Sequence, residues 1–184
     1  MLLLLWRMNI LLGVTGSVAC YKSLDLTRLL TKQGHTVRVL LSKTAASWIS
    51  PVLFHALSGQ KAYTDDDFYT SGMLHIDLTK NIDSFVIAPA TANVISSLAT
   101  GSAYNLITST FLYFHGKQKN TWVAPAMNPN MYSHPAVQKN LDTLRTYGTK
   151  ICEPHDGIAV CGDEGKGKLM PIEDIAKKIT EQQN

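Results

Sequence analysis

Short apolar segments typical of β-strands alternate along this chain with longer amphipathic helical patterns. The strand-like segments cover residues 9–14, 36–41, 84–89, 121–125 and 149–154. The helical patterns cover residues 17–33, 44–57, 91–113 with a break near Gly101, 133–147 and 171–182. Apolar strands that alternate with amphipathic helices indicate a parallel sheet with helices on both faces. We therefore predict a doubly wound α/β fold of the flavodoxin-like or Rossmann-like type.

The length of 184 residues is enough for one well-buried domain and too short for two ordinary ones. We expect that domain to span residues 8–184, because Met8 begins a complete first strand. Residues 1–7 are then additional N-terminal residues, with too few apolar positions before Arg7 for a membrane span or a signal segment. Two long segments, 58–74 and 153–170, carry no regular pattern, and we expect them to be functional loops.

Composition excludes several classes of partner. The net charge of +3 is spread along the chain with no basic run interleaved with aromatic residues, so we expect no nucleic-acid partner and no membrane partner. The cysteines Cys20, Cys152 and Cys161 are odd in number and form no C-x-x-C pair. Free thiols of this kind are typical of a cytoplasmic protein.

Small and hydroxyl residues follow the predicted strands, where ligands bind to a doubly wound sheet. Gly16 and Ser17 lie at a helix start after the first strand, and Thr91 lies at another after the third. Such helix starts favour an anion, although an ordinary N-cap explains Ser17 and Thr91 equally well. The second strand ends in Ser42 and Lys43 without the acidic residue that holds an adenosine ribose, and G-x-G-x-x-G is absent. A mononucleotide therefore fits better than NAD.

Two residues are candidates for proton transfer. His75 follows a long loop and opens a short helix, where the helix dipole disfavours imidazolium, but a lone histidine is more often structural. Cys161 lies in the glycine-rich stretch CGDEGKGKL, which can carry a thiol to a substrate; the alternative is that Cys161 is a small buried hydrophobic residue.

The stretch CGDEGKGKL is not a P-loop, because Leu169 stands where magnesium needs a hydroxyl. The Cys and His spacing matches no standard zinc site, so we expect no metal.

The segments GVTGSVACYK, SKTA, HIDLTKNIDSFVIAPATAN, PAMNPNMY and CGDEGKGKL together resemble the homo-oligomeric flavin-containing cysteine decarboxylases, over nearly the whole chain from Met8. The resemblance implies FMN bound near a subunit interface in trimers or dodecamers. It places FMN contacts on Gly16, Ser17, Val18, Ser42, Lys43, Thr44, Thr91, Ala92, Asn93, Val94 and Ala126. It also implies His75 as the active-site base, Asn128 and Met127 as substrate-binding residues, and Cys161 as the reactive cysteine.

Within that family the match is to members that decarboxylate 4'-phospho-N-pantothenoylcysteine to 4'-phosphopantetheine in coenzyme A biosynthesis. Loss of CO₂ from a cysteine amide needs an electron sink, which oxidation of the thiol carbon supplies. The proline-pinned turn at Pro125 and Pro129 would present Asn128 to the substrate carboxylate. Cys161 would protonate the enethiol during the final reduction.

Two departures and two alternatives accompany this resemblance. Tyr104 stands where relatives commonly have an acidic residue, and no segment encodes the synthetase domain that is fused to many bacterial relatives. A peptidyl-cysteine decarboxylase of the lantibiotic type shares the histidine and the PAMN turn but would not carry the CGDEGKGKL loop. A regulatory flavoprotein without catalytic activity would need long acidic or disordered extensions.

Overall fold

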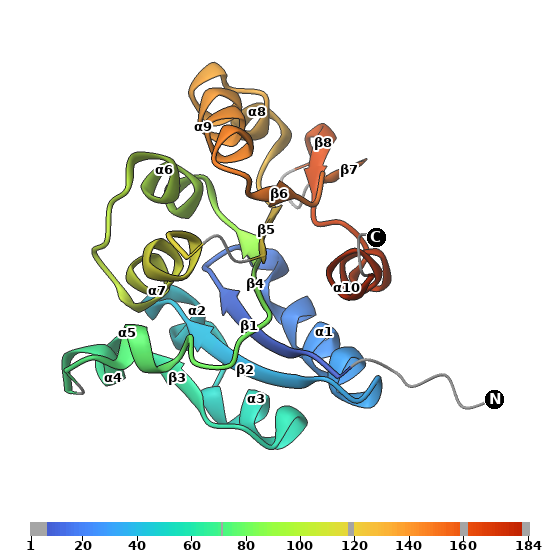
Figure 1. The fold of residues 1–184 in the computed structure, drawn as a ribbon. Helices are drawn as coiled ribbons and strands as arrows, with labels where there is room; N and C mark the ends of the chain where they lie inside the picture. The colour runs from blue at the N-terminus through green and yellow to red at the C-terminus, as the bar shows by residue number, and fades with distance from the viewer. Residues whose placement is uncertain (1–6, 71, 118–119, 159–161, 182–184) are drawn as a thin grey trace.

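The computed structural model describes residues 7–70, 72–117, 120–158 and 162–181. Six strands form one parallel sheet in the order β3-β2-β1-β4-β5-β6 (Figure 1). They are β1 Asn9–Val14, β2 Thr36–Leu41, β3 Ala62–Thr64, β4 Ser84–Ala90, β5 Asn120–Pro125 and β6 Lys150–Ile151. The chain winds in opposite directions from β1 and β4, so a crevice opens beyond the carboxyl ends of these two strands. The predicted doubly wound α/β fold is confirmed.

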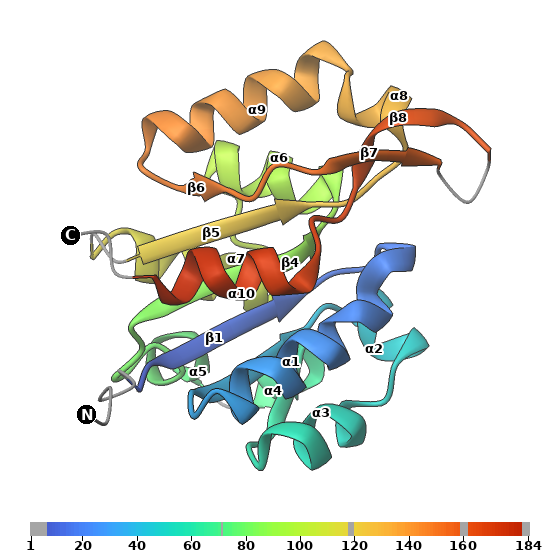
Figure 2. The same cartoon turned by 90° about the vertical axis from the view of Figure 1, so that its right-hand side faces the viewer.

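Helices connect the strands and cover the sheet. They are the 3₁₀ helix η1 Val18–Tyr21 and α1 Lys22–Lys32, α2 Lys43–Trp48, α3 Pro51–Ser58, α4 Asp65–Thr70, α5 Leu74–Asp77, α6 Ala92–Thr100, α7 Leu106–His115, α8 Pro129–Tyr132, α9 Pro135–Thr146 and α10 Ile172–Thr180. A separate antiparallel hairpin, β7 His155–Ile158 and β8 Glu164–Lys168, stands beyond the carboxyl end of β5 (Figure 2). In the described part of the chain, no helix is both long and apolar enough to span a bilayer.

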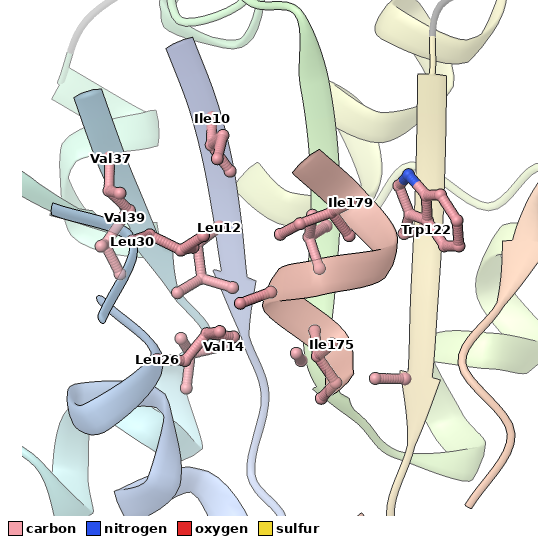
Figure 3. Close-up of a cluster of buried hydrophobic side chains, with 14 of the residues drawn as sticks. Ile10, Leu12, Val14, Leu26, Leu30, Val37, Val39, Trp122, Ile175 and Ile179 are labelled. Atoms are coloured by element: carbon pink, nitrogen blue, oxygen red, sulfur yellow. The ribbon is translucent and has the colours of Figure 1, made fainter. Parts of the chain in front are cut away.

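Two hydrophobic clusters, one on each face, hold the helices to the sheet. Alternate residues of β1 point to opposite faces, as the pleat of a strand requires. Ile10, Leu12 and Val14 join the cluster that includes side chains of α1 and α10 (Figure 3). Leu11 joins the other cluster, which includes side chains of α5, α6, α7 and α9. Both faces of the central strand are therefore buried, which explains why its sequence is apolar after Asn9.

Several element boundaries differ from the sequence prediction. The predicted helix 44–57 is two helices, because Ile49 is extended and Ser50 caps a new helix with Pro51 at its first position. The predicted break near Gly101 is confirmed, since this glycine ends α6 in the left-handed conformation with φ 73°. The predicted strand 149–154 is reduced to the two residues of β6.

The two segments predicted to be irregular contain regular structure. Segment 58–74 holds β3 and α4, and segment 153–170 holds the β7–β8 hairpin. Strand β3 is only three residues long, and the hairpin strands HDGI and EGKGK carry charges and glycines in place of alternating apolar residues. Their sequences therefore carry no alternating apolar pattern that would predict a strand. Contacts with other parts of the fold stabilise these strands instead.

Candidate functional site

The crevice between β1 and β4 is fixed by hydrogen bonds from Thr15, the residue after β1. Its hydroxyl donates to the carbonyl of Pro89 at 2.8 Å and accepts from the backbone N–H of Thr91 at 3.1 Å. Ser23 of α1 adds a third link, as its hydroxyl donates to the carbonyl of Ala88 at 2.8 Å. The side chains of Thr15 and Ser23 are buried, and Thr91 is half-buried. The start of the first helix is thereby held against the end of β4.

Two adjoining hollows open at this edge of the sheet. The first hollow has a volume of about 590 Å³ and lies between the start of α1, the turn after β5 and the β7–β8 hairpin. The second hollow has a volume of about 660 Å³ and lies between the starts of α2, α6 and α7. They share four lining residues, which are Gly16, Thr91, Ala92 and Met131. Volumes of this size are typical of sites for small ligands.

The hollows bring together the residues that the sequence analysis assigned to the cofactor and the substrate, except the two proton-transfer candidates. The first hollow is lined by Gly16, Ser17, Val18, Thr91, Ala92, Ala126, Met127 and Asn128 of that set. The second is lined by Gly16, Ser42, Lys43, Thr44, Thr91, Ala92, Asn93 and Val94. Four separate chain segments contribute these residues, which are 16–18, 42–44, 91–94 and 126–128, so the fold brings together residues that are far apart in sequence.

Ser17 and Thr91 are N-caps, which is the alternative to an anion site that their positions left open, and Ser42 is an N-cap too. The oxygens of Ser17, Ser42 and Thr91 accept from the backbone N–H groups of residues 19, 45 and 94 at 3.4, 3.3 and 3.3 Å. A hydroxyl that accepts one bond still has its own proton to donate. Capping is therefore compatible with a hydrogen bond from each hydroxyl to an anion in the hollow.

Gly16 is required by the close approach of the first and second helix starts. A Cβ at this position would lie 2.5 Å from Cγ2 of Thr44 and 2.6 Å from its Cβ. No side chain fits there without moving α2. The backbone of residue 16 is thus exposed to both hollows, where a ligand can contact it directly.

Tyr104, the departure from the usual acidic residue, also lines the second hollow. Its hydroxyl accepts a hydrogen bond from the side-chain amide of Asn93 at 2.9 Å. The tyrosine therefore engages a predicted cofactor residue.

Two acidic residues of segment 58–74, Asp66 and Asp65, also line the second hollow. Neither was predicted from the sequence, because no motif marks them. Asp65 links two helix starts. Its carboxylate accepts from the backbone N–H groups of Lys43 and Leu106, each at 3.1 Å.

The turn after β5 presents Asn128 to the first hollow. The backbone N–H of Ala126 donates to the carbonyl of Ala90 at 3.1 Å, and that of Met127 donates to the carbonyl of Gly167 in β8 at 3.0 Å. Asn128 caps α8 by accepting from the backbone N–H of residue 130 at 2.8 Å. Its amide group donates to the carboxylate of Asp163 at 2.6 Å. An amide that binds one carboxylate here is suited to bind the carboxylate of a ligand.

Glu153 fastens the hairpin to the helices beside this turn. Its carboxylate accepts from the hydroxyl of Tyr132 at 2.8 Å, from the guanidinium of Arg145 at 2.5 Å and from the ammonium of Lys166 at 3.1 Å. Burial acts to raise the pKa of Glu153, but these hydrogen bonds outweigh it and lower the pKa. Burial and the same contact raise the pKa of Tyr132 to about 12, so its hydroxyl stays a donor at neutral pH.

His75 lies away from both hollows of its own chain. Its ring contacts Phe68, with centroids 5.8 Å apart, and Tyr113, with centroids 6.5 Å apart. Tyr113 is near the end of α7, the helix that leads to the start of β5. Beyond α5, the backbone N–H of Asp83 donates to the carbonyl of Asn9 at the start of β1 at 2.9 Å. The predicted short helix at His75 is confirmed, but this histidine lines neither hollow, whereas Asn128 lines the first.

The reactive-cysteine candidate, Cys161, lies outside the described residues. The other two cysteines are buried free thiols. Burial raises the pKa of Cys152 to about 12, which makes its thiolate inaccessible at neutral pH. These two cysteines are thus structural, as small hydrophobes in the core.

Comparisons with known proteins show the family to which this chain belongs. A family model described as Flavoprotein matches residues 5–184. The chain is 40% identical over 178 residues to a probable phosphopantothenoylcysteine decarboxylase of Streptococcus mutans serotype c (strain ATCC 700610 / UA159), which covers 95% of this chain and 98% of that relative. It is 42% identical over 171 residues to the coenzyme A biosynthesis bifunctional protein CoaBC of Bacillus subtilis (strain 168). That match covers 92% of this chain and 41% of the bifunctional protein, so the chain spans about two-fifths of that relative.

Two solved structures share the fold over nearly the whole chain. A cysteine-to-serine mutant of PPC decarboxylase, complexed with pantothenoylaminoethenethiol, superposes with a TM-score of 0.87 at 28% identity, covering 95% of this chain and 97% of that one. The FMN binding protein AtHal3 superposes with a TM-score of 0.84 at 29% identity, covering 95% of both chains. The architecture that surrounds the two hollows is therefore shared with proteins that bind a flavin and an enethiol.

Proposed function

This chain belongs to the Flavoprotein family, and we propose that it is an FMN-dependent decarboxylase that converts 4'-phospho-N-pantothenoylcysteine to 4'-phosphopantetheine. One observation carries the proposal: the cofactor and substrate residues expected of such an enzyme, drawn from four chain segments, line two adjoining hollows. The relative that matches this chain over 98% of its own length is named for the same reaction.

The second hollow and its junction with the first fit FMN. Hydroxyl groups of Ser42, Thr44 and Thr91 line the second hollow, and the backbone at Gly16 is free of side-chain cover. The residues that directly follow β2 in sequence, Ser42 and Lys43, supply no carboxylate for an adenosine ribose, which favours a mononucleotide over a dinucleotide. We assign the FMN contacts to Gly16, Ser17, Val18, Ser42, Lys43, Thr44, Thr91, Ala92, Asn93, Val94 and Ala126. When bound, FMN supplies a hydride acceptor for oxidation of the thiol carbon and returns the hydride after CO₂ is lost.

The chain's own residues bind the substrate and move protons. Asn128, with Met127 beside it, binds the substrate carboxylate in the position that the Asp163 carboxylate now occupies at its amide. His75 accepts the proton that leaves when the thiol carbon is oxidised. Cys161 donates a proton when the enethiol is reduced, because a thiol is a far stronger acid than a hydroxyl. The apolar walls of the first hollow exclude water from these steps.

We infer that His75 acts in the site of a second copy of the chain. Within one chain this histidine lines neither hollow, whereas Asn128 lines the first hollow. The Nδ1 atom of His75 is buried without a hydrogen-bond partner among the described residues. We assign to the protein a trimer, or a dodecamer built from trimers, in which His75 of one subunit serves the hollows of its neighbour. Exposed apolar side chains such as Tyr69 and Met73, close to His75 in sequence, suit such an interface.

The direct test is anaerobic incubation of the purified, FMN-loaded protein with 4'-phospho-N-pantothenoylcysteine. We expect one CO₂ per product, and a product with a saturated thiol because the reaction has no net change of oxidation state. The matched control is His75→Asn, which should keep FMN and lose turnover. An enethiol, two hydrogens lighter, as the wild-type product would assign the protein to the peptidyl-cysteine decarboxylases. Absence of CO₂ from the loaded wild-type protein would refute the proposal.

A further inference from the structure

The first hollow is nearly devoid of charge, and its charged groups share one sign. Among the described residues that line it, the charged ones are Lys22 and Lys168. Lys22 is the first residue of α1 and Lys168 is the last residue of β8, so two distant segments contribute them. Small and apolar residues form most of the remaining wall. A hollow of this composition attracts an anion to the place where the two ammonium groups lie.

Neither ammonium group is neutralised. Within the described part of the chain, no carboxylate forms an ion pair with Lys22 or Lys168, and neither side chain takes part in a hydrogen bond. Lys166, two residues before Lys168, contrasts with them because its ammonium is bound to Glu153. The charges of Lys22 and Lys168 are therefore available to a ligand.

The aliphatic part of the Lys168 side chain packs against Gly157 on the neighbouring strand β7, where the absence of a Cβ leaves space for it. A Cβ at residue 157 would lie 2.9 Å from Cδ of Lys168. Gly157 itself lines the first hollow, so the lysine stem lies along the wall of this hollow. Any larger residue at position 157 would push the stem aside.

A third hollow of about 400 Å³ adjoins the first, and both lysines line it as well. Its wall contains the carboxylates of Asp25, Asp156 and Glu173, none of which lines the first hollow. An anion in the third hollow would meet these carboxylates, whereas the charged residues that line the first hollow are the two lysines. The favourable position for an anionic group is thus on the first-hollow side.

We propose that Lys22 and Lys168 bind the phosphate monoester of the substrate, an inference that rests on the proposed function. The substrate carries two anionic groups at opposite ends of an uncharged pantothenoyl arm. Asn128 is assigned to the carboxylate, and the apolar wall suits the arm. The lysines are the cations that remain in the same hollow for the phosphate. Lysine ammonium groups are common phosphate ligands, and each acts as a compact point charge.

The cofactor phosphate is a different anion, and the geometry assigns it elsewhere. Lys22 and Lys168 do not line the second hollow, where Ser42, Lys43 and Thr44 are gathered. Loss of either first-hollow lysine should therefore leave the FMN content of the purified protein at the wild-type level.

The experiment compares two substrates on the wild type and four variants. Lys22→Met, Lys168→Met and the control Lys139→Met, an exposed lysine of α9 that lines none of the three hollows, are assayed beside the wild type. Each receives the phosphorylated substrate and the same compound without phosphate. We expect each first-hollow variant to lower the preference for the phosphorylated compound, measured as the ratio of the two kcat/KM values, about 10- to 100-fold. Lys168→Arg should restore most of this preference, since it restores the charge.

The outcomes separate the two proposals. Wild-type protein that decarboxylates neither compound refutes the proposed function, and the lysine assignment with it. An active wild type whose preference for phosphate is unchanged in both first-hollow variants refutes the lysine assignment alone. Loss of FMN from either variant, at unchanged preference, would assign the lysines to the cofactor instead.

Discussion

Gly167 is the position at which a single methyl group should disturb the site most. A Cβ there would lie 2.3 Å from the carbonyl oxygen of Met127 and 3.1 Å from the backbone nitrogen of Pro129. These are backbone atoms of the turn that presents Asn128, so they cannot move aside as a flexible side chain can. Gly167→Ala must therefore separate β8 from this turn.

The free-energy change follows from two effects. Overpacking costs about 1–3 kcal/mol, and loss of the hydrogen bond from Met127 to Gly167 costs about 1 kcal/mol more. The lower entropy of the unfolded alanine chain offsets about 0.4–1 kcal/mol. We expect Gly167→Ala to lower the free energy of unfolding by about 1–3 kcal/mol. Displacement of Asn128 should also lower kcat/KM about 10- to 100-fold.

The control is Gly72→Ala, because a Cβ at residue 72 would meet no atom within 4 Å and its φ is not in the left-handed region. Urea unfolding followed by circular dichroism gives the free energies, and CO₂ release gives kcat/KM. We expect Gly72→Ala to be as stable and active as the wild type. If Gly167→Ala matches Gly72→Ala in both measurements, the close contact between β8 and the turn is not what positions Asn128.

Two further predictions concern the groups that surround the site. The contacts of Glu153 lower its pKa in the folded state, so its contribution to stability is present above the unfolded pKa of about 4.3 and is lost as pH falls through the folded pKa. Glu153→Gln should therefore destabilise the protein at about pH 7 by less than about 1 kcal/mol, given the exposure of the group, and the gap to the wild type in urea unfolding should close in acid. A gap that stays constant with pH would show that the charge of Glu153 is not the cause. Tyr104→Phe removes the acceptor for the Asn93 amide, and we expect FMN affinity, measured by fluorescence titration, to fall about 2- to 10-fold. The double variant with Asn93→Ala should be no weaker than Asn93→Ala alone, and fully additive losses would contradict the coupling.

The sequence predicted the parts of the fold that carry their own periodic signal. Strands β1 and β2 were predicted to the residue because their interior positions are apolar with the single exception of Arg38. The break near Gly101 was predicted because glycine takes the left-handed conformation readily. The hairpin was missed because its strands depend on partners far away in sequence. Its link to the turn, from Met127 to Gly167, and its link to Glu153, through Lys166, are tertiary contacts.

The candidate site was predictable residue by residue only where a motif was present. The helix starts at Ser17, Ser42 and Thr91 were found from small and hydroxyl residues after strands, and the structure gathers them at one edge. Asp65 had no such signal, because it lies in a polar segment without a motif. Its carboxylate accepts hydrogen bonds from two helix starts, and only the fold brings these together. Under the proposed assembly, the place of His75 relative to Asn128 depends on how chains associate, which no pattern within one chain encodes.

Subunit complementation tests most directly whether each active site combines His75 of one chain with Asn128 of another. His75→Asn and Asn128→Ser, which keeps a capping side chain for α8, are each expected to be inactive alone. Co-expressed with two different tags and purified as mixed oligomers loaded with FMN, they should recover about one quarter of wild-type CO₂ release, because random pairing around a ring gives both intact residues at one site in four. Mixed oligomers that stay inactive would contradict the account, since His75 and Asn128 would then have to come from the same chain.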